Sequence, residues 1–495
     1  MGEVRAVAPL LLVPRQGVYS LAADDGRWPL FFDSHPNRVT NEPIISVSGL
    51  RGIVGQSLTP EIVWRYASAF ADVLPDGPIV VTRDGRANGQ ELVAPVVAGL
   101  TRPRPRTVLD GGIAATPTNG VLVRQHGCAG GIQITASHNP LGYNGLKLFT
   151  GEGRVVPDCL GKQILDHYRQ AADAPYVEQQ APPALWLDDT LSAHWALVED
   201  VVDVARIRTR RLRVLLDANH GAGSQLGQLV LERLGCDFKV LGERPDGDFE
   251  HPPEPTEENL AGVLTEVSQY RADVGFCLDP DADRLAIIDE RGRYLGEECT
   301  LAMCAEHVVR QTPGPVVMNC STSRMTEDVA RKYHVPFYRS AVGEANVVDV
   351  MLARSAVIGG EGNGGVIDPR VGLVRDSFIG MALVLEAMSV RETSVSELCD
   401  ELPHYAIRKT KIDLDRAKVP AALDALEREF AAARVDRLDG LRLDWGNPDG
   451  SGCWLLVRPS NTEPIVRLVA EAPTADGADC LCEAGIRVIR AACGS

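Results

Sequence analysis

One pattern recurs along the chain and limits the folds that it can adopt. A short apolar run, typical of a buried strand, is followed by a polar, glycine-containing loop and then by a helical or second strand pattern. Examples are GPIVVTRDGR, GGIQITASHNP, RVLLDANHGAG, ADVGFCLDPDADRLAIID, GPVVMNCSTSR, SAVIGGEGNGGVI and CWLLVRPSNTEP. Helical patterns such as SFIGMALVLEAM alternate with these strands, which predicts an α/β fold with largely parallel sheets. Ligands bind such sheets beyond the carboxyl ends of the strands, where these loops lie.

The length of the chain predicts several domains, because one hydrophobic core could not span 495 residues. Polar or proline-containing stretches suggest boundaries around residues 174–184, 292–298 and 404–411, which give four parts. We expect the first three parts to be similar α/β units. The last is shorter and has antiparallel strand candidates with two helix candidates, and residues 1–40 form an extension to which we assign no function.

Composition narrows the classes of partner and location. A net charge of −17 argues against a nucleic acid or a membrane surface as partner, although a local basic site can still bind an anion. The twelve cysteines include no CxxC pair, so neither a zinc site nor a disulfide framework is indicated. Reduced thiols fit a cytoplasmic protein best. The N-terminal run APLLLV is too short to span a membrane, and we predict no signal peptide.

The hexapeptide DPDADR, residues 279–284, is the strongest single motif. Asp279, Asp281 and Asp283 alternate in a tight loop between the apolar runs VGFCL and LAIID, so three carboxylates can point at one cation. An EF-hand loop is excluded, because Arg284 occupies the position that requires glycine and the flanks are strands. Ligands that offer only oxygen favour Mg²⁺ over zinc. An acidic surface turn is the alternative.

The hexapeptide TASHNP places Ser137 beside His138. A hydrolase triad is not expected here, because adjacent residues of an extended stretch point in opposite directions and no GxSxG motif is present. A turn in which Asn139, Pro140 and Gly142 have only structural roles is the alternative.

Two further loops have the composition of ligand sites. RPSNTEP, residues 458–464, follows a strand and combines an arginine, two hydroxyls and an amide, which suits a phosphate group, although a hairpin turn is equally compatible. Arg467 is either a second cation or an ordinary strand residue. GGEGNGG, residues 359–365, could bring Glu361 against two sugar hydroxyls, or could be a flexible turn.

Two arginines lie beside glycines near the start of the first part. We interpret Arg86, in TRDGR, as an ordinary solvated arginine, and we do not favour this interpretation for Arg51, in SGLRG.

Together these motifs resemble the α-D-phosphohexomutase superfamily, over a span from about Ser46 to Glu471 and in the order found in that superfamily. The resemblance implies three similar α/β domains with mixed sheets and a smaller α+β C-terminal domain around a central cleft. The expected parts are an extension (1–40) and four domains at 41–185, 186–294, 295–405 and 406–495.

The resemblance also implies roles for individual residues. Ser137 corresponds to the serine that carries the phosphoryl group, and it joins Asp279, Asp281 and Asp283 as ligands of Mg²⁺. Lys147 and Arg51 match residues with acid/base and charge-stabilising roles, and we expect nearby cations such as Arg51 to lower the pKa of Lys147. The other matched positions are His138 and Asn139 beside the serine, Arg284 near the catalytic phosphate, Glu361 in the sugar loop, and Arg458, Ser460, Asn461 and Thr462 at the non-reacting phosphate. We also expect Asn363 and Arg467 to bind the substrate.

The implied reaction interconverts hexose 6-phosphate and hexose 1-phosphate through a phosphoserine and a bisphosphorylated sugar. Asn363 and Gly365 stand where many relatives have serine and histidine, and with VGEAN (342–346) they resemble the archaeal-type phosphoglucosamine mutases. Phosphomannomutase or phosphoglucomutase activity is the alternative, followed by a Mg²⁺-dependent sugar-phosphatase and a silent sugar-phosphate sensor. The resemblance further implies hexose 1,6-bisphosphate as activator and a monomer or homodimer.

Overall fold

The computed structural model of the protein describes residues 42–46, 49–171, 183–446, 452–460 and 464–494. Every described residue belongs to one compact unit. The expected extension over residues 1–40 and the predicted phosphate-loop residues Asn461 and Thr462 lie outside the described residues.

The first part of the described chain builds a seven-stranded mixed sheet. Its strands are β1 (Ile44–Ser46), β2 (Gly49–Ile53), β3 (Ile79–Arg83), β4 (Val108–Ile113), β5 (Gly130–Ile134), β6 (Tyr143–Thr150) and β7 (Leu185–Trp186), in the order β1-β2-β6-β5-β3-β4-β7. The helices are α1 (Pro60–Val73), α2 (Gln90–Thr101), α3 (Thr116–Gln125) and α4 (Asp158–Gln170), with the 3-10 turn η1 (Ala87–Gly89). Helix α1 begins with a side-chain cap, since Thr59 accepts a hydrogen bond from the Ile62 amide and Pro60 is the first helical residue.

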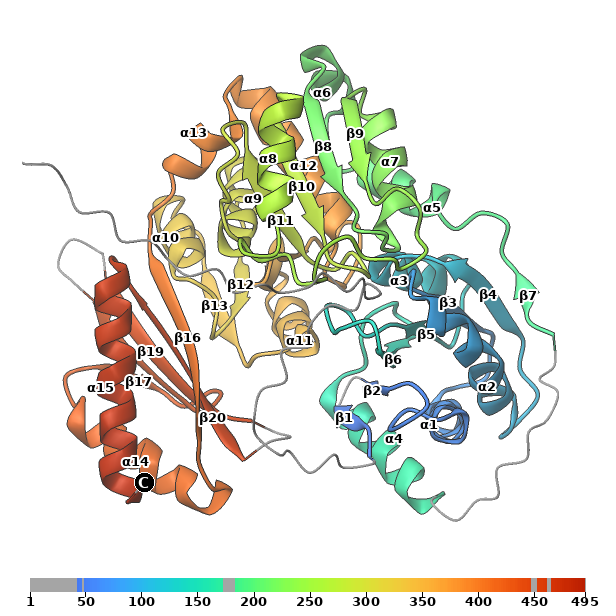
Figure 1. Ribbon diagram of the computed structural model, residues 1–495, viewed down its shortest axis with the longest axis horizontal. Helices are drawn as coiled ribbons and strands as arrows, with labels where there is room; N and C mark the ends of the chain where they lie inside the picture. Colours follow the sequence, from blue (N-terminus) through green and yellow to red (C-terminus); the bar gives the residue numbers. More distant parts are fainter. Residues whose placement is uncertain (1–41, 47–48, 172–182, 447–451, 461–463, 495) are drawn as a thin grey trace, which may run out of the picture. The chain divides into compact units, whose positions relative to one another are not determined.

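The next two parts each build a four-stranded sheet with helices (Figure 1). The second sheet contains β8 (Arg213–Asp217), β9 (Asp237–Leu241), β10 (Val274–Leu278) and β11 (Leu285–Asp289), with α5 (Ser192–Glu199), α6 (Val204–Arg210), α7 (Gly223–Arg233) and α8 (Ala261–Tyr270). The third contains β12 (Val316–Asn319), β13 (Phe337–Ser340), β14 (Ile358–Glu361) and β15 (Gly365–Ile367), with α9 (Glu297–Gln311), α10 (Met325–Lys332), α11 (Glu344–Arg354), α12 (Ser377–Arg391) and α13 (Val395–Asp400).

These three sheets share one topology. In each, four strands that follow one another along the chain take the spatial order second-first-third-fourth, namely β4-β3-β5-β6, β9-β8-β10-β11 and β13-β12-β14-β15. The first three strands are parallel, and the fourth forms an antiparallel hairpin with the third. Each hairpin loop therefore lies at the carboxyl edge of its sheet, where ligands bind. We name these the serine loop (135–142), the aspartate loop (279–284) and the glycine loop (362–364).

The last part has a different architecture. Its strands are β16 (Ala406–Asp413), β17 (Arg434–Asp436), β18 (Leu441–Gly446), β19 (Gly452–Pro459) and β20 (Ile465–Ala472), in the order β16-β20-β19-β18-β17 with every pairing antiparallel. The 3-10 turn η2 (Arg416–Lys418) leads into α14 (Val419–Glu429), and α15 (Ala475–Cys493) ends the described chain. Residues of both helices join one apolar core with the sheet, and Figure 1 shows α15 running along it.

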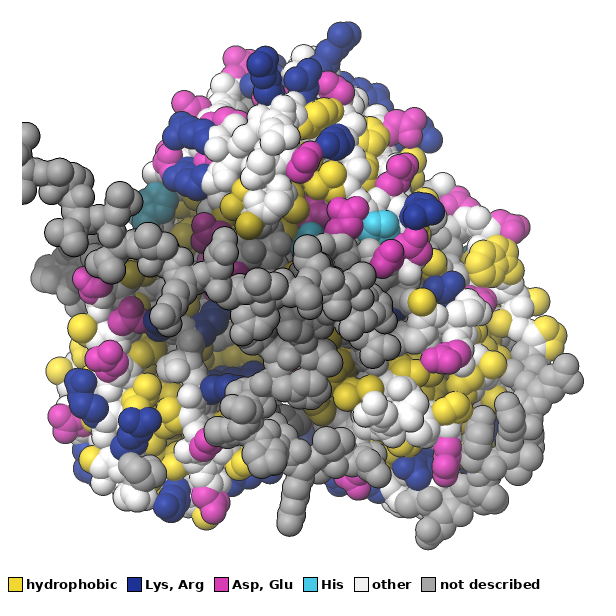
Figure 2. Space-filling model, in the orientation of Figure 1, with side chains coloured by type: hydrophobic (Ala, Val, Ile, Leu, Met, Phe, Trp, Pro, Cys, Tyr) yellow, Lys and Arg dark blue, Asp and Glu magenta, His cyan; other side chains and the backbone are white. Residues whose placement is uncertain are grey.

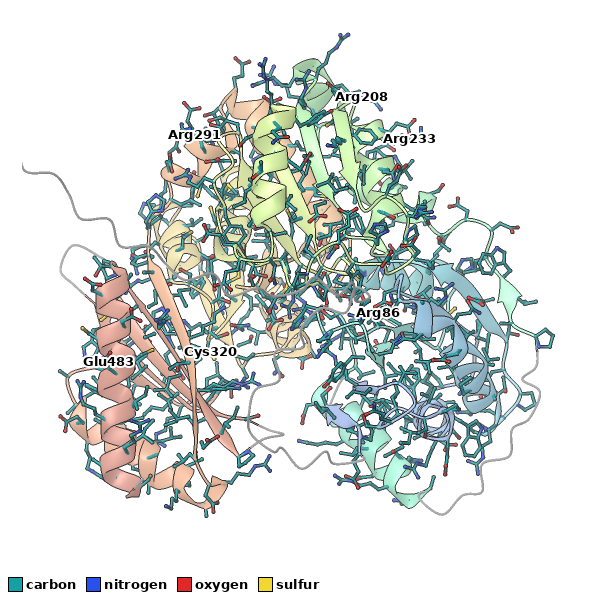
Figure 3. The ribbon with its side chains drawn as sticks, viewed as in Figure 1. Arg86, Arg208, Arg233, Arg291, Cys320 and Glu483 are labelled. Atoms are coloured by element: carbon teal, nitrogen blue, oxygen red, sulfur yellow. The ribbon has the colours of Figure 1, made fainter. Side chains whose placement is uncertain are left out.

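Burial explains why the strands read as continuous apolar runs. Every residue of β5, β10, β11, β12 and β14 is buried, as expected for strands covered on both faces. One apolar cluster includes strands of both the second and the third sheet, with α9 and α12. Cys320, labelled in Figure 3, follows β12 and packs with Trp454, Leu456 and Val469 of the fourth sheet.

The predicted fold class, three α/β units with mixed sheets followed by a smaller α+β unit, is confirmed. Lys and Arg side chains are interspersed with Asp and Glu over the described surface in Figure 2. Within the described residues, no helix is both long and apolar enough to span a bilayer.

Candidate active site

The serine loop holds its hydroxyl in a strained backbone conformation. Ser137 has a φ of 49°, a region that residues other than glycine adopt uncommonly and that is often found at functional sites. Its amide donates to Thr135 Oγ1 at 2.9 Å, and its own Oγ lies 2.9 Å from Asp279 Oδ2. The side chain is buried, so the serine loop delivers a hydroxyl directly to the aspartate loop.

The expectation that Ser137 and His138 point in opposite directions was wrong. His138 Nδ1 lies 3.3 Å from Ser137 Oγ, because the positive φ of Ser137 breaks the alternation of an extended chain. His138 Nε2 is 4.0 Å from Glu254 Oε1. Burial, together with Arg284 and Arg51, lowers the pKa of His138 to about 3, so its imidazole is neutral and a weak proton acceptor. The geometry therefore still does not favour a hydrolase triad.

Arg86 was interpreted wrongly as a solvated arginine. It is 1% exposed, and its guanidinium donates to the carbonyls of Ser137 (2.6 Å), Asn139 and Pro140 (2.9 Å). Its Nε is 3.2 Å from Asp84, whose pKa burial raises to about 6 although Arg86 acts to lower it. Arg86, labelled in Figure 3, thus fixes the backbone of the serine loop from the segment after β3.

The aspartate loop gathers three buried carboxylates. Asp279, Asp281 and Asp283 are each no more than 1% exposed, and one oxygen from each lies within 4.8 Å of the others. Asp279 Oδ1 accepts hydrogen bonds from the amides of Asp283 and Arg284, which closes the turn, and Ala282 has a φ of 55°. The predicted convergence of the three carboxylates is present.

Each of these carboxylates is contacted by a different segment of the first part of the chain. Ser137 contacts Asp279, Lys147 Nζ is 2.8 Å from Asp283 Oδ2, and Thr116 Oγ1 donates to Asp281 Oδ2 at 2.6 Å. Sequence reasoning missed Thr116, the first residue of α3. The only indication in the sequence was that Thr116 carries a hydroxyl shortly after the strand β4. Many residues that do not contact the site share this feature.

The charges of the aspartate loop show that a cation fits there. Burial, and then Asp281 and Asp283, raise the pKa of Asp279 well above its ordinary value. Burial alone would do the same to Asp283, but Arg375 and Lys147 outweigh it and hold that pKa below its ordinary range. Oδ1 of Asp281 and Oδ1 of Asp283 are buried without a hydrogen-bond partner among the described residues. Unpartnered carboxylate oxygens that converge in this way suit a hard divalent cation.

The predicted pKa shift of Lys147 was wrong in direction. Burial lowers the pKa of Lys147, but Asp283 and Glu344 raise it more, and the net pKa is raised. Its Nζ lies 2.8 Å from Asp283 and 2.9 Å from Glu344, so two carboxylates stabilise the charged form. Arg51, the expected cause of lowering, instead lies exposed on β2, with Nη1 3.3 Å from Asn139 Oδ1.

The other predicted residues near these loops are brought together as well. Arg284 is partly buried, with Nη1 3.7 Å from Glu254. Glu361, at the end of β14, is 6% exposed and accepts from Asn319 Nδ2 (2.8 Å) and the Gly343 amide (3.0 Å). Asn363 lies beside it in the glycine loop, placed so that its amide can face both the Glu361 carbonyl and Arg375. These contacts of Glu361 with protein donors were not anticipated from the sequence.

Arg375 was not predicted from the sequence at all. Its guanidinium contacts Asp283 (2.5 Å) and Glu361 (2.9 Å), and it is 8% exposed. Arg375 lies in the segment before α12, beyond the GGEGNGG motif (359–365). Nothing in its sequence context distinguishes it from a surface arginine.

The fourth sheet carries its own basic row. Lys411, Arg467 and Arg458 are direct cross-strand partners on β16, β20 and β19, so their side chains project from one face. Lys411 and Arg467 are exposed, and Arg458 Nη2 lies 3.1 Å from Asp439. Ser460, directly after β19, is buried and its amide donates to the Ile465 carbonyl. Arg467 is thus a strand residue that lies in the same row as Lys411 and Arg458.

A buried serine hydroxyl that contacts a cluster of three carboxylates, with cations around them, is the arrangement expected of a site for phosphoryl transfer. Family models for α/β/α domains I, II and III of phosphoglucomutase/phosphomannomutase match residues 43–174, 193–292 and 297–405, and the model for the C-terminal domain matches residues 410–488. The chain therefore belongs to the phosphoglucomutase/phosphomannomutase family.

Individual relatives agree with this assignment over nearly the whole chain. A phosphoglucomutase/phosphomannomutase of Thermococcus kodakarensis is 35% identical, with 90% of this chain and 98% of the relative covered. A probable phosphoglucosamine mutase of Methanopyrus kandleri is 32% identical, with 90% and 97% covered. The crystal structure of a family protein from Burkholderia thailandensis superposes with a TM-score of 0.77 at 25% identity, over 91% of this chain and 98% of that one. The predicted superfamily and the predicted class of enzyme, an intramolecular phosphotransferase, are confirmed.

Proposed function

We propose that the protein is a phosphoglucosamine mutase, which interconverts glucosamine 6-phosphate and glucosamine 1-phosphate through a phosphoserine at Ser137. The observation that carries the proposal is the 2.9 Å contact between Ser137 Oγ and Asp279, inside a cluster of three buried carboxylates. A hydroxyl so placed can exchange a phosphoryl group while a metal ion remains beside it.

Asp279, Asp281 and Asp283, together with the phosphorylated Ser137, are the residues that would hold Mg²⁺. The ion supplies positive charge against the charge that develops on the transferring phosphoryl group. The unpartnered oxygens of Asp281 and Asp283 support this assignment, because they have no other means of satisfying their lone pairs among the described residues.

The residues of the site have different roles in the phosphoryl transfer. The bond from phosphorus to Ser137 Oγ breaks as a sugar hydroxyl oxygen bonds to phosphorus, which gives a bisphosphorylated sugar. Lys147, a charged ammonium, donates its proton to the departing serine oxygen and takes up the proton of the attacking hydroxyl. The reverse transfer from the other end of the sugar then restores the phosphoserine. Arg51, His138 and Arg284 lie around the transferring group and bind it through hydrogen bonds and charge.

The fourth part of the chain holds the phosphate that does not react. Arg458, Ser460 and Arg467 supply the charge and the hydrogen-bond donors, with Asn461 and Thr462 from the same loop. Either end of the sugar can then face Ser137 while the opposite phosphate stays on the basic row.

Glu361 and Asn363 bind the sugar hydroxyls. The relative from M. kandleri, named a probable phosphoglucosamine mutase, supports glucosamine phosphate as the substrate. A broader phosphoglucomutase/phosphomannomutase activity is the second candidate, and the 35% identity to the T. kodakarensis enzyme of that name favours it.

The proposal also covers the activator, the oligomeric state, the cellular compartment and the domain bounds. Hexose 1,6-bisphosphate acts as the activator that keeps Ser137 phosphorylated, and the enzyme works as a monomer or homodimer. All twelve thiols are free, which supports a reducing compartment such as the cytoplasm. The domains span residues 41–185, 186–294, 295–405 and 406–495. Each of the four sheets falls within one of these ranges, except that β7 extends the first sheet to Trp186.

The test is turnover of glucosamine 6-phosphate, glucose 1-phosphate and mannose 1-phosphate with Mg²⁺ and a hexose 1,6-bisphosphate, with both the isomer and free phosphate measured. Isomer without free phosphate, fastest for glucosamine phosphate, is the expected result. A higher kcat/KM for glucose or mannose phosphate would favour the second candidate. Release of free phosphate alone would identify a phosphatase, and no reaction with any sugar would leave a sugar-phosphate sensor.

A further inference from the structure

Arg375 contacts the aspartate loop and the sugar-binding residue Glu361 at the same time. Its Nη2 lies 2.5 Å from Asp283 Oδ2 and its Nη1 lies 2.9 Å from Glu361 Oε2. Both carboxylates and the guanidinium are buried. One planar side chain therefore spans a proposed metal ligand and a proposed sugar ligand.

Arg375 is also part of a closed ring of charges. Its backbone amide donates to Glu344 Oε1 at 2.9 Å, and its Nε lies 3.5 Å from Glu344 Oε2. The same Glu344 Oε2 is 2.9 Å from Lys147, which returns to Asp283 at 2.8 Å. Cations and carboxylates alternate around the ring, so each charge is balanced by two neighbours and a change at one of them alters the positions preferred by the others.

Two residues in or beside the glycine loop accommodate the Arg375 side chain. A Cβ atom at Gly365 would lie 2.3 Å from Arg375 Cδ, well inside van der Waals contact. Only glycine at this position leaves room for the arginine. When the amide of Asn363 is oriented to satisfy both of its polar atoms, its oxygen accepts from Arg375 Nη1 at 2.8 Å. Asn363 and Gly365 therefore both lie next to the Arg375 side chain.

We propose that Arg375 is a positioning residue that sets sugar specificity by fixing Glu361 and Asn363 relative to the metal ligand Asp283. This inference rests on the proposed function. The rigid fork of a guanidinium can hold two carboxylates at a defined separation, whereas a lysine ammonium keeps the charge but is a single point with no fixed fork. Discrimination between sugars that differ at one carbon requires such defined donors and acceptors.

The direct test replaces Arg375 by lysine. We expect R375K to reduce the kcat/KM preference among the glucosamine, glucose and mannose phosphates by about tenfold or more, since correctly placed hydrogen bonds to hydroxyl groups carry discrimination of this size. We also expect its Mg²⁺ affinity, measured by isothermal titration calorimetry without sugar, to fall by roughly 10- to 100-fold, as for other partners of metal ligands. R370K is the matched control, because Arg370 lies five residues earlier and pairs with Asp368.

A second variant keeps every charge. In G365A the new methyl group displaces the Arg375 side chain, so the sugar preference should fall as in R375K, whereas G262A should have no effect because its methyl group would enter open space. If R375K does not fold, G365A decides the question. Wild-type preference and wild-type Mg²⁺ affinity in a folded R375K, or wild-type preference in G365A, would overturn the inference. If the wild-type enzyme converted none of the sugars, the proposed function would fail, and the Mg²⁺ titration of R375K would still show whether Arg375 positions Asp283.

Discussion

The proposed transfer site and the basic row of the fourth sheet both bind phosphate in our proposal, yet they are built in opposite ways. Around the aspartate loop, the charges are buried and contact one another at 2.5 to 2.9 Å, as in Arg375–Asp283, Lys147–Asp283 and Lys147–Glu344. On the fourth sheet, Lys411 and Arg467 are exposed and face each other as like charges. In the first arrangement the cations are paired with carboxylates of the protein, whereas an anion against the second would reduce the repulsion between its neighbouring cations.

The difference follows from what each region must do. A group that stabilises a transition state acts best when it is already fixed in a dry environment, because no reorganisation is then needed during the reaction. A group that holds the distal phosphate must release and rebind it whenever the sugar turns over, which suits exposed cations in a high dielectric. Substitutions in the first region should therefore have large effects and those in the second small ones.

The largest effect is expected for Ser137→Ala. Removal of the hydroxyl that carries the phosphoryl group should reduce kcat by roughly 10⁴-fold or more, as for other covalent catalysts that lose their nucleophile. The loss should be accompanied by the absence of a phosphorylated serine peptide in the mass spectrum after incubation with hexose 1,6-bisphosphate. Ser389→Ala is the control, since it removes another buried hydroxyl, on α12, that donates to the Leu385 carbonyl. Full turnover by S137A would refute the phosphoserine route.

Sequence reasoning located the loops of the transfer site but not the residues that support them. The triad Asp279, Asp281 and Asp283 could be predicted because alternation within one loop between two apolar strands is a local signal. Thr116 contacts a residue 165 positions away in the sequence, and Arg375 contacts one 92 positions away. No single-sequence pattern encodes such pairings, which arise only when the sheets are assembled.

The errors have the same physical origin. Arg86 was taken as solvated because an arginine in a glycine-containing loop usually is, but the carbonyls that it binds belong to a loop more than fifty residues later. The pKa of Lys147 was predicted from the cations in the motifs, whereas Glu344, which was noted only as part of VGEAN, contributes a carboxylate that raises it. The shared topology of the three sheets was expected only as a general similarity, and it explains why all three functional loops are equivalent hairpins.

The next largest effect should come from the support of the serine loop. Arg86→Met leaves Asp84 as a buried carboxylate without its cation and removes donors from four carbonyls, which should lower the free energy of unfolding by about 3–5 kcal/mol. Urea denaturation measures the change. Lys239→Met, which breaks an exposed pair with Glu266, should cost no more than about 1 kcal/mol. The double variant Arg86→Met/Asp84→Asn should recover part of the loss, and a single variant as stable as the K239M control would show that Arg86 does not hold the loop.

A smaller effect is expected when a residue that contacts the aspartate loop is replaced without a change in charge. Thr116→Val keeps the shape of the side chain but removes the 2.6 Å hydrogen bond to Asp281, so Mg²⁺ affinity should weaken by roughly 10- to 100-fold. Calorimetric titration with Mg²⁺ measures this directly. Thr326→Val is matched in shape and burial, and the Thr326 hydroxyl has no hydrogen-bond partner among the described residues, so its Mg²⁺ affinity should remain that of the wild type. Equal affinities for T116V and T326V would mean that the aspartate loop is positioned by its own backbone.

The smallest effect tests the exposed region itself. Lys411→Ala removes one cation from the row with Arg467 and Arg458, and KM for the hexose phosphate should rise by about two- to fivefold with kcat unchanged, since exposed charges contribute at most ~1 kcal/mol. Raising the ionic strength should shrink the difference between K411A and the wild type, because salt screens exposed charges. Lys162→Ala, on α4, makes the same change in net charge away from the row and should leave KM unaltered. A large fall in kcat for K411A would mean that the basic row takes part in the transfer and does not only hold the distal phosphate. That result would contradict the contrast between the buried transfer site and the exposed basic row.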